Sequence, residues 1–351
     1  MRRYPCALSR NEGGRPTSRK LAALALLSGL LASAGCGAKE EKKPPERWIA
    51  VIPKGTTHEF WKSVHAGALK AASELAEAGK PAIKIQWKGP IREDDRDAQI
   101  NVVDDFVTRR FAAIVLAPLD DQALVGPCVD AKEHGIPVVI IDSGLQWDGR
   151  VSFVATDNRR GGALGAERLG EALGGKGKAA MLRYAEGSAS TMEREAGFLE
   201  TMKANFPAIE LVSTEQHGGA TSETALQAME NLLGRFAELD GIFTPNESTT
   251  FGALRALEAA GRAGPNGSVK LVGFDASAPL VDGLRRGAIE GLVVQNPFKM
   301  GELGVKAAVD ALEGRPVAPR IDTGCVVATP QNMETPEIAA VLHPDLDRWL
   351  K

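Results

Sequence analysis

The sequence predicts an α/β fold built on parallel sheets. From Arg47 onward, short apolar runs alternate with longer amphipathic ones. The apolar runs are nearly continuous in Val, Ile and Leu, which is typical of strands buried on both faces, and helical patterns lie between most of them. The chain has 351 residues, more than one hydrophobic core usually organises, so two domains are expected.

Ten strands are expected from apolar runs bounded by turn residues. They are WIAVIP (48–53), AIKIQWKG (82–89), AAIVLAP (112–118), PVVIID (137–142), VSFVAT (151–156), KAAMLRY (178–184), IELVST (209–214), GIFTP (241–245), VKLVGF (269–274) and EGLVVQ (290–295). Nine helices are expected between and after them, at 59–79, 94–110, 121–135, 161–175, 193–206, 222–239, 249–261, 278–287 and 299–314.

The first residues have the pattern of an export signal. A basic stretch precedes the apolar run LAALALLSGLLASAG, which is shorter than the ~20 residues of a membrane span. It ends in SAGC, which resembles a bacterial lipobox, although Ser33 stands where Leu is usual. We therefore expect a lipoprotein signal peptide over 1–36 with Cys36 lipidated, and a charged tether over 37–47. The alternative is ordinary cleavage after ASA, with Cys36 uninvolved.

Two further cysteines lie in the body of the chain. Cys128 falls in an expected helix and Cys325 in a late apolar run. Two isolated thiols are the prediction, and a disulfide between them is the alternative for an exported protein. No Cys or His spacing indicates zinc, and we expect no cofactor.

Polar residues gather where the expected strands end. Right-handed crossovers place the carboxyl ends of all parallel strands at one edge, where ligands bind. Such residues follow six of the strands, where they are candidates for a binding site, and N-capping is the alternative for each alone. They are Lys54, Asp142, Asn246, Asp275 and Gln295, together with the pair Asp120–Asp121, which we interpret as capping residues.

Several classes of function are excluded or disfavoured. The formal net charge of -3 gives no basic surface for nucleic acid. The stretch GGKGKAA lacks the ending of a phosphate loop, and GGALGAERLG lies inside a helical pattern rather than after a strand. There is no G-x-S-x-G elbow and no nucleophile paired with a base, so an enzyme is not expected.

The chain resembles the sugar-binding proteins of bacterial ABC transporters, of the ribose-binding type, over about 48–327. The similarity is carried by EFWKSVHAGALKAA, IPVVIIDS, FVATDNRRGGALGAERL, EREAGF, GALRALEAAG, LVGFDAS and VVQNP. The resemblance implies two doubly wound lobes joined by a three-strand hinge, near 155–158, 295–297 and 322–324. Lobe one is expected at 48–156 plus 297–323 and lobe two at 157–296 plus 324–329. A C-terminal tail at 330–351 would add two short helices, TPEIAAVL and PDLDRWL.

The resemblance also implies a set of ligand-binding positions between the lobes. These are Lys54, His58, Phe60, Trp61, Asp142, Ser143, Asn158, Arg194, Asn246, Asp275 and Gln295. One ring of Phe60–Trp61 is expected to stack on an apolar sugar face, while carboxylates, amides and a guanidinium bind hydroxyls.

For three of these predictions, the residues have an alternative role in the structure rather than in ligand binding. For Phe60–Trp61 it is a pair of core or staple residues, and for Asp275 it is capping of the helix that follows. For Arg194 it is a salt bridge to Glu193 or Glu195.

The ligand itself stays open at this stage. Lobe two has Ala220 or a neighbour where ribose binders have a stacking aromatic, Ser143 replaces an Arg, and Lys54 replaces a small polar residue. A hexose, a disaccharide and a sugar acid bound near Lys54 are all open, as is a polyol, nucleoside or furanosyl signal. The expected partners are this ligand and the permease of an ABC transporter, for a monomer held at the cell envelope or in the periplasm by its lipid. A LacI-type regulator is disfavoured because no helix-turn-helix precedes the fold.

Overall fold

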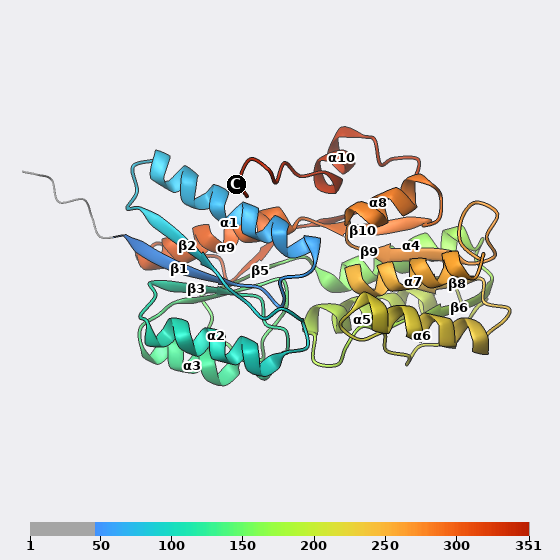
Figure 1. Ribbon diagram of the computed structural model, residues 1–351, viewed down its shortest axis with the longest axis horizontal. Helices are drawn as coiled ribbons and strands as arrows, with labels where there is room; N and C mark the ends of the chain where they lie inside the picture. Colours follow the sequence, from blue (N-terminus) through green and yellow to red (C-terminus); the bar gives the residue numbers. More distant parts are fainter. Residues whose placement is uncertain (1–45, 351) are drawn as a thin grey trace, which may run out of the picture. The chain divides into compact units, whose positions relative to one another are not determined.

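The computed structural model describes residues 46–350, and the fold over this range is shown in Figure 1. The expected signal peptide, Cys36 and nearly all of the expected tether lie outside the described residues. Every expected strand and helix of the body is present, and the two sheets confirm the predicted α/β class.

The first sheet organises lobe one. Its six strands are all parallel, in the order β11-β5-β4-β3-β1-β2. Their bounds are β1 Arg47–Ile52, β2 Ile83–Trp87, β3 Ala113–Leu116, β4 Val138–Ile141, β5 Ser152–Ala155 and β11 Arg320–Asp322. Helices α1 (Glu59–Glu77) and α9 (Pro297–Leu312) pack together on one face, with α2 (Arg96–Thr108) and α3 (Val125–Glu133) on the other (Figure 1).

The second sheet organises lobe two and has the same strand arrangement. Its order is β12-β10-β9-β8-β6-β7. The strands are β6 Gly177–Met181, β7 Ile209–Ser213, β8 Gly241–Phe243, β9 Lys270–Phe274, β10 Gly291–Gln295 and β12 Cys325–Ala328. The helices are α4 Asn158–Ala172, α5 Ala189–Asn205, α6 Ser222–Arg235, α7 Glu247–Ala259 and α8 Ala278–Arg285. One edge departs from a purely parallel sheet, because β12 pairs antiparallel with β10.

Both faces of each sheet are buried, which explains the continuous apolar strands. In β1, Ile49 and Val51 belong to the cluster under α1 and α9, while Ala50 and Ile52 belong to the cluster under α2 and α3. All four side chains are fully buried. Because the central strands are buried on both faces, most polar residues lie at strand ends, in loops or on the edge strands β2, β7 and β11.

The chain passes between the lobes three times, at β5 to α4, β10 to α9 and β11 to β12. Two of these links are hydrogen-bonded to each other. The amide of Thr323 donates to the carbonyl of Ala155 at 3.2 Å, and the amide of Asp157 donates to Asp322 Oδ1 at 3.3 Å. The links therefore lie together rather than at separate edges.

Each lobe contains at least one helix pair that meets backbone to backbone at glycines. A Cβ on Gly67 of α1 would overlap the carbonyl of Phe298 at the start of α9, and one on Gly301 would overlap the carbonyl of Val64. In lobe two, Gly162 of α4 meets α5 in the same way. Close helix packing of this kind fixes the helices that carry the linking segments.

The C-terminal segment beyond β12 packs on lobe two. The expected helix TPEIAAVL is confirmed as α10 (Pro336–Leu342), and Met333, Ile338 and Leu342 are buried in the lobe-two core. The expected helix at PDLDRWL is wrong. Residues 347–349 form a single turn, because no side chain of 344–350 is buried against the lobe to stabilise a short helix, unlike Ile338 and Leu342 of α10.

Cys128 and Cys325 are both free thiols, as predicted, with Cys128 buried and Cys325 half-buried. Burial raises the pKa of the Cys128 thiol to about 12. A thiol of this kind is an apolar packing group rather than a nucleophile.

Candidate functional site

A pocket lies between the lobes where the loops after the strands meet. Fourteen residues from both lobes line it. Nine of the eleven predicted ligand-binding residues are among them: Lys54, His58, Phe60, Trp61, Asp142, Arg194, Asn246, Asp275 and Gln295. The other five are Glu93, Tyr184, Ser190, Thr191 and Glu247.

Asp142 and Asp275 occupy equivalent places in the two lobes. Asp142 follows β4 and Asp275 follows β9, and each strand is the third from the same edge of its sheet. Both residues have left-handed backbone, with φ of 61° and 70°, and each amide donates to the neighbouring strand, at Val154 and Val293. This uncommon backbone turns each carboxylate out of the strand direction and into the pocket.

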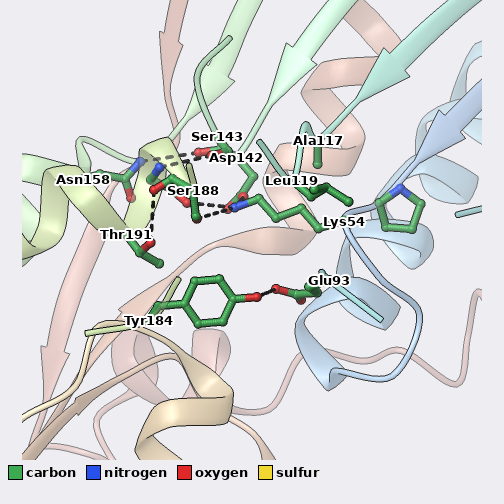
Figure 2. A network of polar contacts seen from close by, with 12 residues as sticks. Lys54, Glu93, Ala117, Leu119, Asp142, Ser143, Asn158, Tyr184, Ser188 and Thr191 are labelled. Carbon is green, nitrogen blue, oxygen red and sulfur yellow. Dashed lines mark hydrogen bonds and ion pairs between the residues drawn. The ribbon is translucent and has the colours of Figure 1, made fainter. Parts of the chain in front are cut away.

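Lys54 follows β1 and crosses from lobe one toward lobe two. Its ammonium lies 3.1 Å from Asp142 Oδ2 and donates to Ser190 Oγ at 3.0 Å and Ser188 Oγ at 3.2 Å. Figure 2 shows Lys54 extended toward Asp142 and Ser188. An ammonium has three donors, so this one is fully engaged by the protein.

Glu93 is the centre of a second polar cluster. Its Oε1 lies 2.6 Å from His58 Nδ1 and accepts from the indole of Trp61 at 2.6 Å. Its Oε2 accepts from the Tyr184 hydroxyl of lobe two at 2.7 Å (Figure 2). Glu93 therefore links three pocket residues, one of them across the cleft.

The Glu93–His58 pair is ionised at neutral pH. Burial opposes the charge on each group, but their mutual attraction and hydrogen bond outweigh it. The pKa of Glu93 is lowered to about 2, and that of His58 is raised to about 9. The side chain of His58 is thus a cation in the pocket wall.

Arg194 is a buried donor fixed by the protein on three sides. Its Nε donates to Asn158 Oδ1 at 2.8 Å, its Nη1 donates to the carbonyl of Pro245 at 2.9 Å, and its plane stacks over the Phe274 ring at 4.0 Å. Its Nη2 has no hydrogen-bond partner among residues 46–350 and lies 4.0 Å from Asp142 Oδ1. A buried donor without a partner is a position where a ligand oxygen is needed.

The alternative role of Arg194 as a neighbour's ion-pair partner is wrong. Glu193 pairs with Arg159 at 2.9 Å on the surface, and Glu195 pairs with Arg183 at 2.8 Å. Adjacent residues of α5 point in different directions, so Glu193 and Glu195 face away from the guanidinium of Arg194.

Asp275 is connected to two other pocket residues. Its Oδ1 accepts from Gln295 Nε2 at 2.7 Å, and its Oδ2 accepts from the amide of Glu247 at 3.0 Å. Burial raises the pKa of Asp275, although Arg194 opposes this. Gln295 Oε1 is the second orphan, because it has no hydrogen-bond partner within the described chain.

The helix that follows Asp275 is capped by lobe one instead. Glu59 Oε2 accepts from the amide of Ala278, in the first turn of α8, at 2.9 Å. Conversely, Glu247 of lobe two caps α1 of lobe one. Its carboxylate accepts from the amides of Glu59 and Phe60 at the start of α1, at 3.2 and 3.1 Å. The alternative of Asp275 as the cap is therefore wrong, and the two lobes cap each other's helices.

Asn246 does act as the N-cap of α7. Its Oδ1 accepts from the amide of Thr249 at 3.2 Å, and its Nδ2 donates to Ser248 at 3.2 Å. It also lines the pocket, so the capping alternative and the site prediction describe the same side chain.

The two adjacent aromatic residues, Phe60 and Trp61, differ in their burial. Trp61 is 3% exposed and belongs to the lobe-one core, with its indole N–H held by Glu93. Phe60 is half-buried, and the two rings meet edge to face with centroids 4.8 Å apart. Both line the pocket, and Phe60 is the ring with freely exposed surface.

Comparison with known proteins agrees with this architecture. A family model described as the periplasmic binding protein domain matches residues 49–316. The chain belongs to this family.

Three relatives of this periplasmic binding protein cover nearly all of its body. A D-ribose/D-allose-binding protein of Pseudomonas aeruginosa is 28% identical over 92% of this chain and 99% of its own. An ABC transporter solute binding protein from Agrobacterium vitis, solved with bound D-fucose, is 37% identical, with a TM-score of 0.77 over 84% of this chain and 100% of its own. A carbohydrate transporter solute binding protein from Agrobacterium radiobacter, in complex with D-arabinose, is 31% identical, with a TM-score of 0.80 over 85% and 99%.

Two predicted residues of this periplasmic binding protein lie behind the pocket wall rather than in it. Ser143 is fully buried, and its hydroxyl accepts from the amide of Ser190 at 3.1 Å. Asn158 holds Arg194 and donates to the carbonyl of Asp142 at 3.4 Å (Figure 2). Both position pocket residues in the ligand-free protein.

Sequence reasoning missed five pocket residues, three of which had a usable signal. Glu93 lies in the loop after β2, Tyr184 ends the run KAAMLRY, and Glu247 directly follows Asn246. All three come after a strand, so the rule applied to the other strands also covers them. Tyr184 supplies an aromatic ring from lobe two, where the sequence had indicated only Ala220 or a neighbour. Ser190 and Thr191 carried no comparable pattern.

Neither a membrane span nor a metal site emerges from the described residues. No helix between residues 46 and 350 combines the length and hydropathy needed to cross a bilayer. Within the same range, no group of three His, Cys, Asp or Glu side chains is placed to hold a metal ion.

Proposed function

We propose that this protein is the extracytoplasmic receptor of an ABC transporter and binds one monosaccharide between its lobes. The observation that carries the proposal is the pair of orphaned polar atoms in the pocket. Arg194 Nη2 needs an acceptor and Gln295 Oε1 needs a donor, and a sugar hydroxyl supplies either.

The composition of the pocket wall supports a saccharide. Phe60 offers an apolar face for ring C–H groups, and burying that area contributes about 2–3 kcal/mol. Asp142 and Asp275 offer carboxylates for hydroxyl donors, and each charge-assisted bond contributes roughly 1.5–3 kcal/mol. The relatives solved with D-fucose and D-arabinose bind ligands of this class.

Polar bridges across the pocket favour a monosaccharide over a disaccharide. Lys54 and Tyr184 form polar bridges across the cleft at its border, so there is little room for a second ring.

Transport would use closure of the two lobes. A ligand that touches both lobes stabilises the closed form, and a permease can distinguish that form from the open one. We propose lobe boundaries at 48–156 plus 297–323 and 157–296 plus 324–329, with 330–351 as a tail. We further propose a monomer tethered through lipidated Cys36 after removal of residues 1–35 with the signal.

A thermal-shift titration of the mature chain with D-arabinose, D-fucose, D-allose and D-ribose tests the function. A specific sugar at 100 times its Kd should stabilise the protein by about 2.7 kcal/mol. Small-angle scattering should then show compaction, and Asp275→Asn should remove the shift. If no sugar binds and a polyol or nucleoside is found by mass spectrometry in the native protein, the receptor has a non-sugar ligand.

A further inference from the structure

Lys54 is a buried cation that does not offer a donor to a ligand. Its side chain is 4% exposed, and its ammonium is shared among Asp142, Ser188 and Ser190 at 3.0–3.2 Å. Asp142 Oδ2 is correspondingly occupied, which leaves its Oδ1 directed toward the ligand and toward Arg194. The cation therefore acts on the ligand through Asp142.

The pocket wall as a whole has nearly balanced charge. It contains seven Lys, Arg, His, Asp and Glu side chains, three basic and four acidic: Lys54, His58, Arg194, Glu93, Asp142, Asp275 and Glu247. His58 is protonated at neutral pH, since its pKa is about 9, and Glu247 is half ionised, since burial raises its pKa to about 7. Burial also raises the pKa of Asp275, so the three positive charges face at most four negative charges.

Each basic group in this wall has an acidic neighbour, and Lys54 and Arg194 share the same one. Lys54 pairs with Asp142 at 3.1 Å and His58 with Glu93 at 2.6 Å, while Arg194 lies 4.0 Å from Asp142. The carboxylate of a sugar acid would have to share Arg194 with Asp142, and burying a carboxylate that is not fully paired is costly. A protonated amino sugar would meet Asp142 only by competing with Lys54.

We propose that Lys54 is a specificity-determining residue that restricts the site to uncharged ligands by serving as the built-in counter-ion of Asp142. This inference rests on the proposed function as a saccharide receptor. The inference also gives a role to the contacts of Lys54 with Ser188 and Ser190. These two serines belong to lobe two, so they hold the ammonium over Asp142 only when the lobes are together.

Calorimetric titration of the wild-type protein and Lys54→Met tests the proposal. The uncharged probes are D-fucose, D-arabinose, D-allose and D-ribose, the acids are D-galacturonate and D-glucuronate, and the amines are D-galactosamine and D-glucosamine. D-fucose and D-galacturonate form a matched pair, since they differ only in the group at C6. Lys62→Met is the control variant, because Lys62 is an exposed lysine of α1 outside this pocket.

The wild type should bind an uncharged sugar more tightly than any acid or amine. Lys54→Met should weaken that sugar and shift the ratio of amine to uncharged affinity at least tenfold toward the amine, because Asp142 is then unpaired. Lys62→Met should leave the ratio unchanged. The double variant Lys54→Met with Asp142→Asn removes both charges, should lose the amine preference, and covers the case in which the single variant is unstable.

Two results would overturn the inference, and they are distinguishable. Tighter binding of a uronate or amino sugar than of every uncharged sugar by the wild type would reject the role of Lys54 but keep a saccharide receptor. An unchanged ratio in Lys54→Met would do the same. Absence of binding by sugars of all three charge classes would reject the proposed function itself.

Discussion

Arg194 is held in its binding geometry before a ligand arrives. Two of its nitrogens are used by Asn158 and Pro245, and its plane rests on Phe274, so only Nη2 is left for the pocket. A guanidinium fixed in this way loses little side-chain entropy when it binds a hydroxyl. Lysine carries the same charge but has neither the plane nor the fork of donors.

Replacing Arg194 with lysine should therefore weaken sugar binding even though the charge is unchanged. We expect affinity for the bound sugar to fall about 30- to 150-fold, the equivalent of one charge-assisted hydrogen bond of roughly 2–3 kcal/mol. Calorimetric titration measures this, with Arg159→Lys on the exposed side of α4 as the control. A loss smaller than threefold would show that Nη2 does not contact the ligand.

The ionisable wall also makes stability depend on pH, with a definite sign. His58, facing Glu93, Glu247 and Asp275, has its pKa raised from 6.5 to about 9, and burial raises that of Glu247 from 4.5 to about 7. Both groups bind their proton more tightly in the folded state. The contribution of Glu247 is complete below pH 4.5 and lost through pH 7, and that of His58 is complete below pH 6.5 and lost through pH 9.

The free energy of unfolding should consequently decrease from pH 5 to pH 9, by an amount on the order of 5 kcal/mol. Urea unfolding at a series of pH values measures it. His58→Gln should flatten the part of the curve between pH 7 and pH 9. Stability that rises over that interval in the wild type would contradict the ionised Glu93–His58 pair.

At the scale of helices, the lobes exchange their N-terminal caps. Residue His58, at the N-cap of α1, makes no capping bond with its own side chain, and neither does Ser277 at α8. Glu247 and Glu59 accept from those two helix starts across the cleft instead. Carboxylates are favourable at the positive end of a helix dipole, so each cap also favours the closed arrangement.

Glu59→Ala should weaken sugar binding although Glu59 does not line the sugar pocket. Loss of one cap contributes about 0.5–2 kcal/mol, so affinity should fall about 2- to 30-fold. Small-angle scattering of the ligand-free variant should show a larger radius than the wild type. Glu77→Ala, at the opposite end of α1, is the matched control, and equal effects of the two changes would reject a role in closure.

Over the whole described chain, the C-terminal segment is the feature that the resemblance did not account for. Met333, Ile338 and Leu342 are 3–7% exposed and complete the core cluster of lobe two. A cavity beyond them is lined by residues of α1, of α8 and of the segment from Val341 to Leu350. The C-terminal tail is thus packed into the core of lobe two.

Ile338→Ala should destabilise the protein by about 2–4 kcal/mol, as expected for an aliphatic side chain removed from a core. Thermal unfolding of the ligand-free protein measures the change, and Val129→Ala, at a side chain that is 36% exposed, provides the control. If both variants unfold like the wild type, the C-terminal segment does not contribute to the core.

Strand and helix positions were predictable because buried strands and amphipathic helices leave strong patterns. The strand-end rule located five of the fourteen pocket residues, and the family resemblance added four. Other features depended on pairing between distant segments. The antiparallel direction of β12 follows from its short link to β11, and the sequence of CVVA is compatible with either direction. The role of Lys54 likewise depends on Ser188 and Ser190, which are 134 and 136 residues away.

The three linking segments also limit how the receptor can open. Since the links at 155–158 and 322–325 are hydrogen-bonded to each other, they cannot separate without breaking those bonds. Twisting or sliding of one lobe on the other would stretch one link while compressing its neighbour, whereas rotation about their common line changes none of their lengths. The lobes should accordingly open by this one rotation. A single interlobe distance, followed with a pair of spin labels, should then suffice to report whether the molecule is open or closed.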